Sequence, residues 1–287
     1  MRLDEINLRD PFVLVHEGRY YLYGTRGATC WGPADGFDAY VSGDLVQWDG
    51  PFECFHNDGD FWADRNYWAP EVHALGGAFY MFASFKSEAR RRGTAILRAE
   101  SPLGPFAPWS DGPVTPPEWE CLDGTLYVDG QGLNWMVFCH EWVQAGDGTV
   151  CALPLTGDLR AAAGKPRVLF RGSDVPWRRR MRHSSGTEGY VTDGPFLWRM
   201  TDGALICLWA SFSNAGYAEA QAVSESGGIE GPWRQLEPLF MRDGGHGMVF
   251  RGLDGKLRLA LHSPNEHLME RPRFFEVVEA GGALRLK

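Results

Sequence analysis

The chain has 287 residues and a formal net charge of −9 at pH 7. This acidic balance argues against a nucleic-acid partner, because phosphate binding needs a basic field, and no apolar run approaches the ~20 residues that a membrane helix requires. Its 36 glycines, 18 prolines, 12 tryptophans, 9 tyrosines and 17 phenylalanines predict many turns between aromatic-rich strands.

The first element in chain order is a pair of strands near the N-terminus. Residues 9–12 begin an apolar strand beside an acidic residue, a glycine-containing turn follows, and residues 20–25 form a second apolar strand. The same plan returns at 68–71 with 79–85, at 122–125 with 135–138, at 192–196 with 205–209, and at 245–248 with 257–263. Short apolar runs rich in aromatic and β-branched residues are typical of strands.

Weaker turn signals at 43–48, 101–106, 157–159 and 231–233 lie between these pairs, so each repeat has room for about four strands. The repeats begin about 50 to 70 residues apart, a spacing that is typical of propeller blades. No linker or change of composition interrupts them. We therefore predict an all-β fold, a five-bladed β-propeller with roughly four antiparallel strands per blade, forming a single domain over residues 1–287.

One polar residue marks the beginning of each repeat. In a propeller the innermost strands surround the axis, so these residues converge at one end of the central channel. The marker residues are Asp10, Glu71, Asp123, Asp193 and His246. An Asp before Gly or Pro is a common turn residue, but unpaired buried carboxylates are costly and four of them are hard to explain as turns. Carboxylates that lie close together shift one another's pKa, which suits acid–base chemistry in an active site at that end of the channel.

Two basic stretches, residues 90–92 and residues 178–180 with Arg182, are interpreted as solvated loops, the usual place for runs of like charge. The six cysteines form no C-x-x-C pair, and no zinc or redox motif is present. No apolar segment typical of a secretory signal precedes Asp10, so we expect a cytoplasmic protein.

At these residues the chain resembles glycoside hydrolase family 43, the five-bladed propeller arabinosidases and xylosidases, over nearly its whole length. Residues 9–11 resemble the segment with the family's general base, which implies that role for Asp10. Residues 122–127 are similar to the D-P-S-L-F segment, whose Asp tunes the acid, here Asp123. Residues 193–198 stand where the family has E-G-P-H-L-Y, whose Glu is the general acid, here Asp193.

The resemblance also implies binding residues. Residues 68–71 resemble the W-A-P-D segment that lines the substrate pocket, which assigns Trp68 and Glu71 to the substrate. Trp31 and Trp142 are expected near the same end of the channel, where flat aromatic faces can pack on sugar C–H groups. Residues 245–250 resemble the glycine-flanked axial histidine that often takes part in a calcium or water cluster. His246 is therefore a candidate to contact calcium through waters, and no other cofactor is expected.

One departure from the family pattern concerns the proton donor. Asp193 replaces a glutamate and is one methylene shorter, which by bond length alone withdraws the carboxyl by ~1.5 Å. Glu188 and Glu141 are the alternative acids. We place Asp193 before Glu188 and Glu188 before Glu141, because the sequence around Asp193 matches the family segment best.

The sequence thus predicts an inverting, exo-acting glycoside hydrolase. It would release a terminal α-L-arabinofuranosyl unit, or a β-D-xylosyl or β-D-galactofuranosyl unit, from short oligosaccharides. A catalytically silent propeller that binds carbohydrate is the alternative, and the departure at Asp193 is what favours it. The oligosaccharide is the expected partner, and the oligomeric state is left open.

Overall fold

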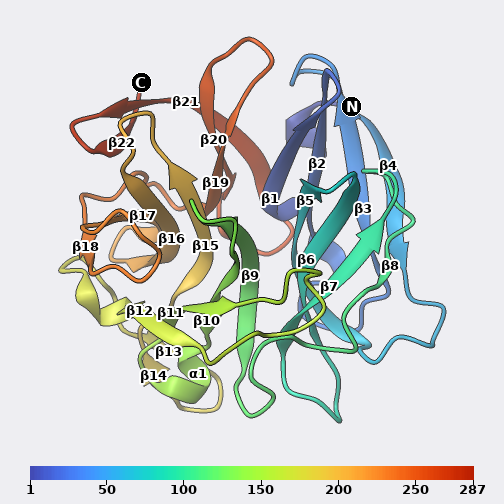
Figure 1. The fold of residues 1–287 in the computed structure, drawn as a ribbon, viewed down its shortest axis with the longest axis horizontal. Coiled ribbons are helices and arrows are strands. Elements are labelled where there is room, and N and C mark those ends of the chain that lie inside the picture. Colours follow the sequence, from blue (N-terminus) through green and yellow to red (C-terminus); the bar gives the residue numbers. More distant parts are fainter.

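The structure is a computed structural model that describes all 287 residues. Five four-stranded antiparallel sheets stand around a common axis, with β1, β5, β9, β15 and β19 in the middle of the molecule (Figure 1). Within each sheet the strands follow one another in chain order from the axis outward, and these first strands contact the first strands of neighbouring sheets. The predicted five-bladed β-propeller with four strands per blade is confirmed.

The five blades use consecutive segments of the chain. Blade 1 contains β1 (Leu8–His16), β2 (Arg19–Arg26), β3 (Gly36–Ser42) and β4 (Asp49–His56). Blade 2 contains β5 (Arg65–Leu75), β6 (Ala78–Lys86), β7 (Gly93–Ala99) and β8 (Ala107–Pro108). Blade 3 contains β9 (Cys121–Val128), β10 (Asn134–His140), β11 (Thr149–Pro154) and β12 (Arg167–Arg171). Blade 4 contains β15 (Asp193–Arg199), β16 (Leu205–Ser213), β17 (Gly216–Ser224) and β18 (Trp233–Gln235), and blade 5 contains β19 (Gly245–Arg251), β20 (Leu257–Ser263), β21 (Arg271–Ala280) and β22 (Ala283–Leu286).

The remaining elements are short. A two-stranded hairpin of β13 (Met181–Arg182) and β14 (Glu188–Gly189) lies between blades 3 and 4 in the chain, and the helix α1 (Trp142–Ala145) connects β10 to β11. Three 3-10 turns cover Leu3–Glu5, Gly27–Thr29 and Gly172–Asp174. The longest helical element is therefore a single turn, and none is long and apolar enough to cross a membrane.

Burial decreases from the second strand of a blade to its outer edge. Nearly every residue of β6 and β16 is buried, because each of these strands lies inside its sheet with neighbouring blades on both faces. The outermost strands β4, β12 and β18 are mostly exposed or half-buried. Strands covered on both faces carry continuous apolar runs rather than an alternating pattern, as β6 and β16 do. The four weaker turn signals all fall between the third and the fourth strand of a blade, where an outer hairpin turns.

Side chains close the ring between the last blade and the first. No strand is exchanged between the chain ends, since β1 belongs to blade 1 and β22 completes blade 5. At this junction Arg9 Nη1 donates to Glu270 Oε1 at 2.5 Å, and Glu270 is fully buried. Asn7 Nδ2 donates to the backbone oxygen of Glu270 at 3.1 Å. An ion pair and a backbone contact therefore join the two ends of the propeller.

Replacing Glu270 with Ala is expected to destabilise the protein by about 3–5 kcal/mol, because a nearly buried guanidinium loses its charged partner. Urea unfolding followed by circular dichroism measures this change. Glu276→Ala is the control: Glu276 pairs with Lys256 and Lys287 at an exposed edge, so its loss should leave the unfolding midpoint almost unchanged. Equal midpoints for the two variants would show that the Arg9–Glu270 pair does not hold the ring closed.

Candidate active site

The innermost strand of every blade is interrupted at the same place. At that place one residue has the left-handed conformation, and the strand register shifts there, as in a β-bulge. These residues are Asp10 (φ 53°), Ala69 (φ 47°), Asp123 (φ 57°), Gly194 (φ 49°) and His246 (φ 54°). For a residue other than glycine this conformation costs roughly 1–2 kcal/mol, and such strain concentrates at functional sites. The fold thus repeats one left-handed position five times around the axis, and at four of the five it holds a residue other than glycine.

The residue that follows each bulge residue leaves no backbone N–H without a hydrogen-bond partner. In blades 1, 2 and 4 it is proline (Pro11, Pro70 and Pro195), which has no N–H to satisfy. In blades 3 and 5 it is glycine, and a side chain of the preceding blade accepts the N–H. Gly124 N donates to Thr94 Oγ1 at 3.1 Å, and Gly247 N donates to Glu219 Oε2 at 2.9 Å. Gly124, which departs from the family's proline, is therefore accommodated by Thr94.

The bulges correct the alignment of repeats inferred from the sequence. Asp10, Asp123 and His246 occupy equivalent positions, as predicted. Asp193, however, precedes the bulge residue of its blade by one position, and Glu71 follows that of blade 2 by two. Ala69 and Gly194 hold the equivalent positions. The sequence repeat was misaligned because the polar residue of each repeat was taken as its marker, whereas the backbone conformation is what the blades share.

A cavity of about 630 Å³ surrounds the bulges at one end of the channel. All five blades, the β13–β14 hairpin and the segment after β20 contribute to its lining. The lining residues are Arg9, Asp10, Trp31, Asn66, Trp68, Arg92, Leu122, Asp123, Glu141, Trp142, Val143, Met181, Arg182, His183, Ser184, Val191, Asp193, Phe212, Tyr217, His246, Asn265 and His267. The structure therefore brings Asp10, Asp123, Asp193 and His246 together, as the sequence predicted.

The three tryptophans predicted to contact substrate all line this cavity. Trp31 is 58% exposed and meets Trp68 edge to face, with 5.5 Å between the ring centroids. Trp68 Nε1 donates to the backbone oxygen of Cys30 at 2.5 Å, which fixes the indole. Trp142 is the first residue of α1, which connects β10 to β11 in blade 3. These rings provide the apolar faces on which a sugar can pack.

Two of the predicted site residues do not line the cavity. Glu71 is buried farther along β5, with its carboxylate 3.5 Å from His73 Nε2. Glu71 lies two residues beyond the bulge of its strand and is not among the residues that line the cavity. Glu188 is exposed in β14 and lies 3.6 Å from Arg180. Neither residue is placed to touch a ligand in the cavity.

Glu141, the third candidate acid, does line the cavity but is held in an ion pair with Arg92. The interpretation of residues 90–92 as a solvated loop is wrong for Arg92, which is buried. Its guanidinium lies over the Trp68 ring, 3.9 Å from the centroid. The ion pair engages one carboxylate oxygen of Glu141 and holds that side chain against the wall of the cavity.

The carboxylates around the axis are linked through His246. His246 Nδ1 lies 3.2 Å from Asp10 Oδ1 and 3.8 Å from Asp123 Oδ2. Asp123 Oδ2 also accepts the backbone N–H of Gly194 at 3.0 Å, which ties blade 3 to the residue beside Asp193. Tyr217 donates its hydroxyl to Asp193 Oδ2 at 2.9 Å, so one oxygen of Asp193 is held and the other is left for a ligand.

The surroundings separate the pKa values of these groups. Burial raises the pKa of Asp10, but His246 and Arg9 outweigh burial and bring it below its ordinary value. Burial, and then the negative charge of Asp123, raise the pKa of Asp193 to about 7. Burial alone would lower the pKa of His246, yet the carboxylates, Asp10 first, raise it to about 9. At neutral pH Asp10 is therefore ionised, His246 is a cation, and Asp193 retains a proton in a large share of molecules.

A hydrogen-bonded chain behind Asp10 sets its orientation. Thr25 donates to Asp10 Oδ2 at 2.6 Å, and Asp10 N donates to His262 Nδ1 at 3.2 Å. Burial lowers the pKa of His262 to about 3, so its ring is neutral and Nε2 carries the proton. Nε2 then donates to Asn265 Oδ1 at 3.2 Å, which also accepts from Arg9 Nη2 at 2.9 Å. The carboxylate is thus fixed by neighbours from blades 1 and 5.

The groups around His246 do not make a ready calcium site. No cluster of three or more His, Cys, Asp or Glu side chains has the arrangement of a metal site. Calcium prefers six to eight oxygen ligands, whereas Asp10 Oδ1 faces the Nδ1 of a cationic imidazole at 3.2 Å and Oδ2 already accepts the Thr25 hydroxyl. The predicted calcium stays a prediction, and no step of the chemistry below depends on it.

The fold and this arrangement define a class of enzyme. An ionised carboxylate and a protonated carboxyl face one cavity, with aromatic rings beside them. This combination is typical of the active site of a glycoside hydrolase. The chain matches the family model of glycosyl hydrolases family 43 over residues 5–275. It belongs to that family, whose members hydrolyse O-glycosyl bonds characteristically with inversion.

Solved structures support the assignment. The chain is 40% identical to the endo-arabinase from Bacteroides thetaiotaomicron VPI-5482, with a TM-score of 0.91 over 98% of this chain and 97% of that chain. A thermostable family-43 glycoside hydrolase is 23% identical, with a TM-score of 0.83 over 98% and 93% of the two chains. An endo-1,4-beta-xylanase from Bacteroides thetaiotaomicron VPI-5482 is 21% identical, with a TM-score of 0.79 over 98% and 94%. The last two show the same fold. No curated protein sequence matches the chain.

Sequence reasoning missed several residues that shape the site. Arg9 could have been suspected from its place directly before Asp10, since a cation beside a carboxylate lowers the carboxylate's pKa. Tyr217, in the third strand of blade 4, and Asn265, in the segment after β20, gave no signal. Tyr217 reaches Asp193 across β16 within blade 4, and Asn265 reaches Arg9 only because the ring brings the last blade beside the first.

Proposed function

We propose that this protein is an exo-acting, inverting α-L-arabinofuranosidase that acts on short oligosaccharides, with Asp10 as general base and Asp193 as general acid. One observation carries the proposal: a carboxylate with a lowered pKa and a carboxyl with a raised pKa border the same cavity. Environments that push two carboxyl groups apart in pKa assign the base and the acid.

The reaction follows from these two roles. Asp10 takes a proton from a water molecule as the water oxygen attacks the anomeric carbon. Asp193 gives its proton to the glycosidic oxygen as the bond from that oxygen to the anomeric carbon breaks. The products are a sugar of inverted anomeric configuration and an alcohol, and the proton on Asp10 passes back to Asp193 through solvent. Asp123 keeps the acid protonated by its negative charge and holds Gly194 beside it.

The sugar is proposed from similarity. The 40% identical structure is described as an endo-arabinase, which supports an arabinofuranosyl substrate over the xylosyl and galactofuranosyl alternatives. The exo mode is proposed from the cavity lining. Residues of all five blades border the cavity, together with the β13–β14 hairpin and the segment containing Asn265 and His267. A space bordered on every side suits the end of a chain better than its middle.

A substrate panel tests this function. We expect p-nitrophenyl α-L-arabinofuranoside to be hydrolysed with a kcat/KM at least tenfold above those of the matching β-D-xyloside and β-D-galactofuranoside. Arabino-oligosaccharides labelled at the reducing end should lose one sugar at a time from the other end, and NMR should show the inverted anomer first. Internal cleavage to mixed oligomers would reject the exo mode, and retention of configuration would reject the assigned roles.

The pKa shifts predict the pH profile and its response to Asp123→Asn. Asp193 acts when protonated, so activity is full below its raised pKa and is lost as the pH rises through about 7. Asp10 acts when ionised, so activity is lost as the pH falls through its pKa. Because that pKa is lowered, this loss of activity occurs at a lower pH than for an ordinary aspartate. Removing the charge of Asp123 lowers the pKa of Asp193, so the alkaline limb of kcat/KM should move to lower pH by about one unit or more. An alkaline limb that stays in place would remove Asp123 from this role.

A further inference from the structure

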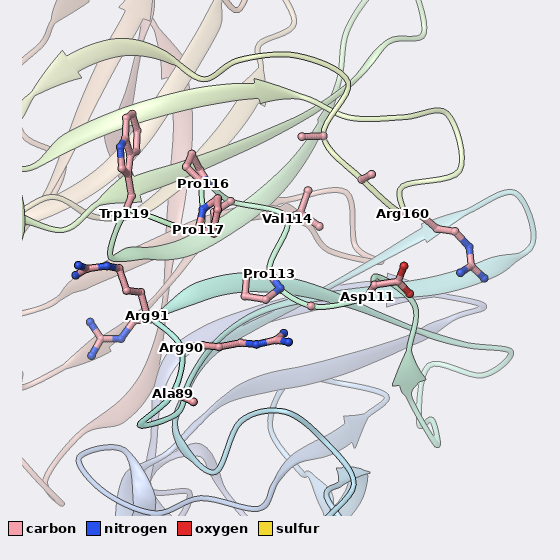
Figure 2. Close-up of a pocket in the computed structure, with 15 residues that line it drawn as sticks. Ala89, Arg90, Arg91, Asp111, Pro113, Val114, Pro116, Pro117, Trp119 and Arg160 are labelled. Carbon is pink, nitrogen blue, oxygen red and sulfur yellow. The ribbon is translucent and has the colours of Figure 1, made fainter.

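A second cavity, of about 640 Å³, lies between blades 2 and 3 and is within the size range of small-ligand sites. Its walls come from three loops that are distant in the sequence: residues 89–92 between β6 and β7, residues 111–117 with Trp119 between β8 and β9, and residues 160–162 between β11 and β12. Figure 2 shows Arg90 extending toward Pro113, with Trp119 and Arg160 on other sides of the space. The proposed reaction uses none of these loops except through Arg92.

The charge of this cavity is opposite to that of the protein. Four arginines and only one acidic residue, Asp111, line it, although the whole chain carries a net charge of −9. Arg92 is paired with Glu141, and Arg91 lies 3.8 Å from Glu120. The other two guanidinium groups lack a carboxylate partner and contact aromatic rings instead. Arg90 lies over Trp62 at 5.7 Å, and Arg160 lies over Trp109 at 3.8 Å.

Free guanidinium groups of this kind select a carboxylate or phosphate. The planar fork of arginine binds such groups with two parallel hydrogen bonds, and stacking on an indole leaves the edge of the fork free to donate. Both arginines are exposed. An anionic group entering the cavity would therefore meet two guanidinium groups that form no salt bridge.

The wall is held in place before any ligand arrives. Val114 N donates to Thr94 O at 2.8 Å, and Ser110 Oγ donates to Gly112 O at 2.7 Å. Trp109 Nε1 donates to Asp158 O at 2.7 Å, which joins the loop of blade 2 to the loop of blade 3 that carries Arg160. Three prolines, at 113, 116 and 117, restrict the backbone further. A preorganised wall lowers the entropic cost of binding.

Flat apolar surfaces accompany the charge. Trp119 lines the cavity and has one face stacked on His140, with 4.3 Å between ring centroids and an angle of 9°. The proline rings and Trp119 can pack on the C–H face of a sugar ring. A ligand that combines such a face with a negative charge is an acidic sugar, in which a carboxylate is fixed to the ring.

The two cavities share a wall. Arg92 lines both of them, and its two partners, Trp68 and Glu141, line the cavity around Asp10. We propose that the second cavity binds a uronic acid unit of the same oligosaccharide whose terminal sugar occupies the active site. The inference rests on the proposed function for the oligosaccharide substrate, whereas the binding of a uronic acid can be tested without catalysis.

Calorimetric titration with trigalacturonate tests the binding site. We expect trigalacturonate to bind at least tenfold more tightly than the neutral trisaccharide made by reducing its carboxyl groups, with an affinity that falls as salt rises. The double variant Arg90→Gln with Arg160→Gln should lose at least tenfold in affinity and keep its melting temperature, since both side chains are exposed. Arg285→Gln, an exposed arginine in blade 5, is the matched control and should change nothing.

Inorganic phosphate is the second probe, because it supplies an anion without a sugar ring. If phosphate binds as tightly as trigalacturonate and the double variant loses both, the cavity is a general anion site and the proposal is wrong. Equal affinity of the wild-type protein for the acidic and neutral trisaccharides also overturns it. An affinity for trigalacturonate that the double variant retains would place the sugar elsewhere, with the same consequence.

Kinetics then separate this inference from the proposed function. On arabinofuranosyl oligosaccharides that carry a uronic acid, the double variant should show a raised KM with kcat unchanged, and on the neutral counterparts both constants should stay at wild-type values. Binding of trigalacturonate by a protein that hydrolyses no arabinofuranoside would reject the proposed function and leave the site. Hydrolysis of arabinofuranosides without preferential binding of trigalacturonate would reject the site and leave the function.

Discussion

Replacing Asp10 with Asn is expected to lower kcat/KM by about 10²–10⁴-fold, because the attacking water loses its general base. The amide has the same shape and can still accept the Thr25 hydroxyl, which is 2.6 Å from Asp10 Oδ2. His246 faces the replaced oxygen, and with the negative charge gone it should release its proton and accept from the new amide. The variant should therefore fold normally, and the loss should appear in turnover.

The Asp10→Asn experiment has two internal controls. Asp4→Asn changes an exposed carboxylate near Arg2 and should leave both turnover and melting temperature unchanged. Added azide supplies a nucleophile that needs no deprotonation, so it should restore part of the turnover of the Asp10→Asn protein by forming a glycosyl azide of inverted configuration. If azide has no effect while the variant binds substrate normally, Asp10 does not act as the base.

Asp193→Ala is expected to show a loss that depends on the leaving group. For an oligosaccharide, whose departing alkoxide must be protonated, kcat/KM should fall by about 10²–10⁴-fold. For a dinitrophenyl glycoside, whose leaving group departs as a stable anion, the loss should be small. The alkaline limb of the pH profile should disappear together with the group whose pKa is raised to about 7. Rates over a series of aryl glycosides measure this dependence.

The two other candidate acids serve as matched controls for Asp193. Glu188→Gln should leave turnover unchanged, since Glu188 is exposed in β14 and does not line the cavity. Glu141→Gln should affect substrate binding through Arg92 and Trp68, with a similar effect for all leaving groups. Asp193→Glu retains a carboxyl and should keep the pH limb that Ala abolishes. A leaving-group dependence in the Glu141 variant, and none in the Asp193 variant, would transfer the acid role to Glu141.

The position of Asp193 relative to the bulge matters for its role as the acid, in addition to the length of its side chain. Asp193 precedes the bulge residue of its blade, so its side chain enters the cavity from a different position than Asp10 and Asp123. Tyr217 of the third strand and the backbone N–H of Gly194, through Asp123, hold its surroundings. Acid function is thus a property of the pocket around residue 193, and the length of its side chain is only one part of it.

The sequence alone determined the architecture. Short apolar runs, repeated five times with turn signals between them, are typical of sheets that bury their apolar faces by stacking around an axis. Such runs can be recognised in short stretches of the sequence. The same reasoning named Asp10, Asp123, Asp193 and His246 as neighbours, because the first strands of a propeller must meet at its centre.

Only the tertiary structure decided which groups surround those carboxylates. Arg9, Glu270 and Asn265 meet across the closure of the ring, although more than 250 residues separate Arg9 from the other two. The pKa of a buried carboxyl depends on distances of a few ångströms to charges that the chain order does not reveal. Glu71 has the expected residue type in the expected repeat, yet it is buried outside the cavity lining. Arg92 belongs to a run of arginines that is typical of a solvated loop, yet it is buried and forms part of the cavity wall.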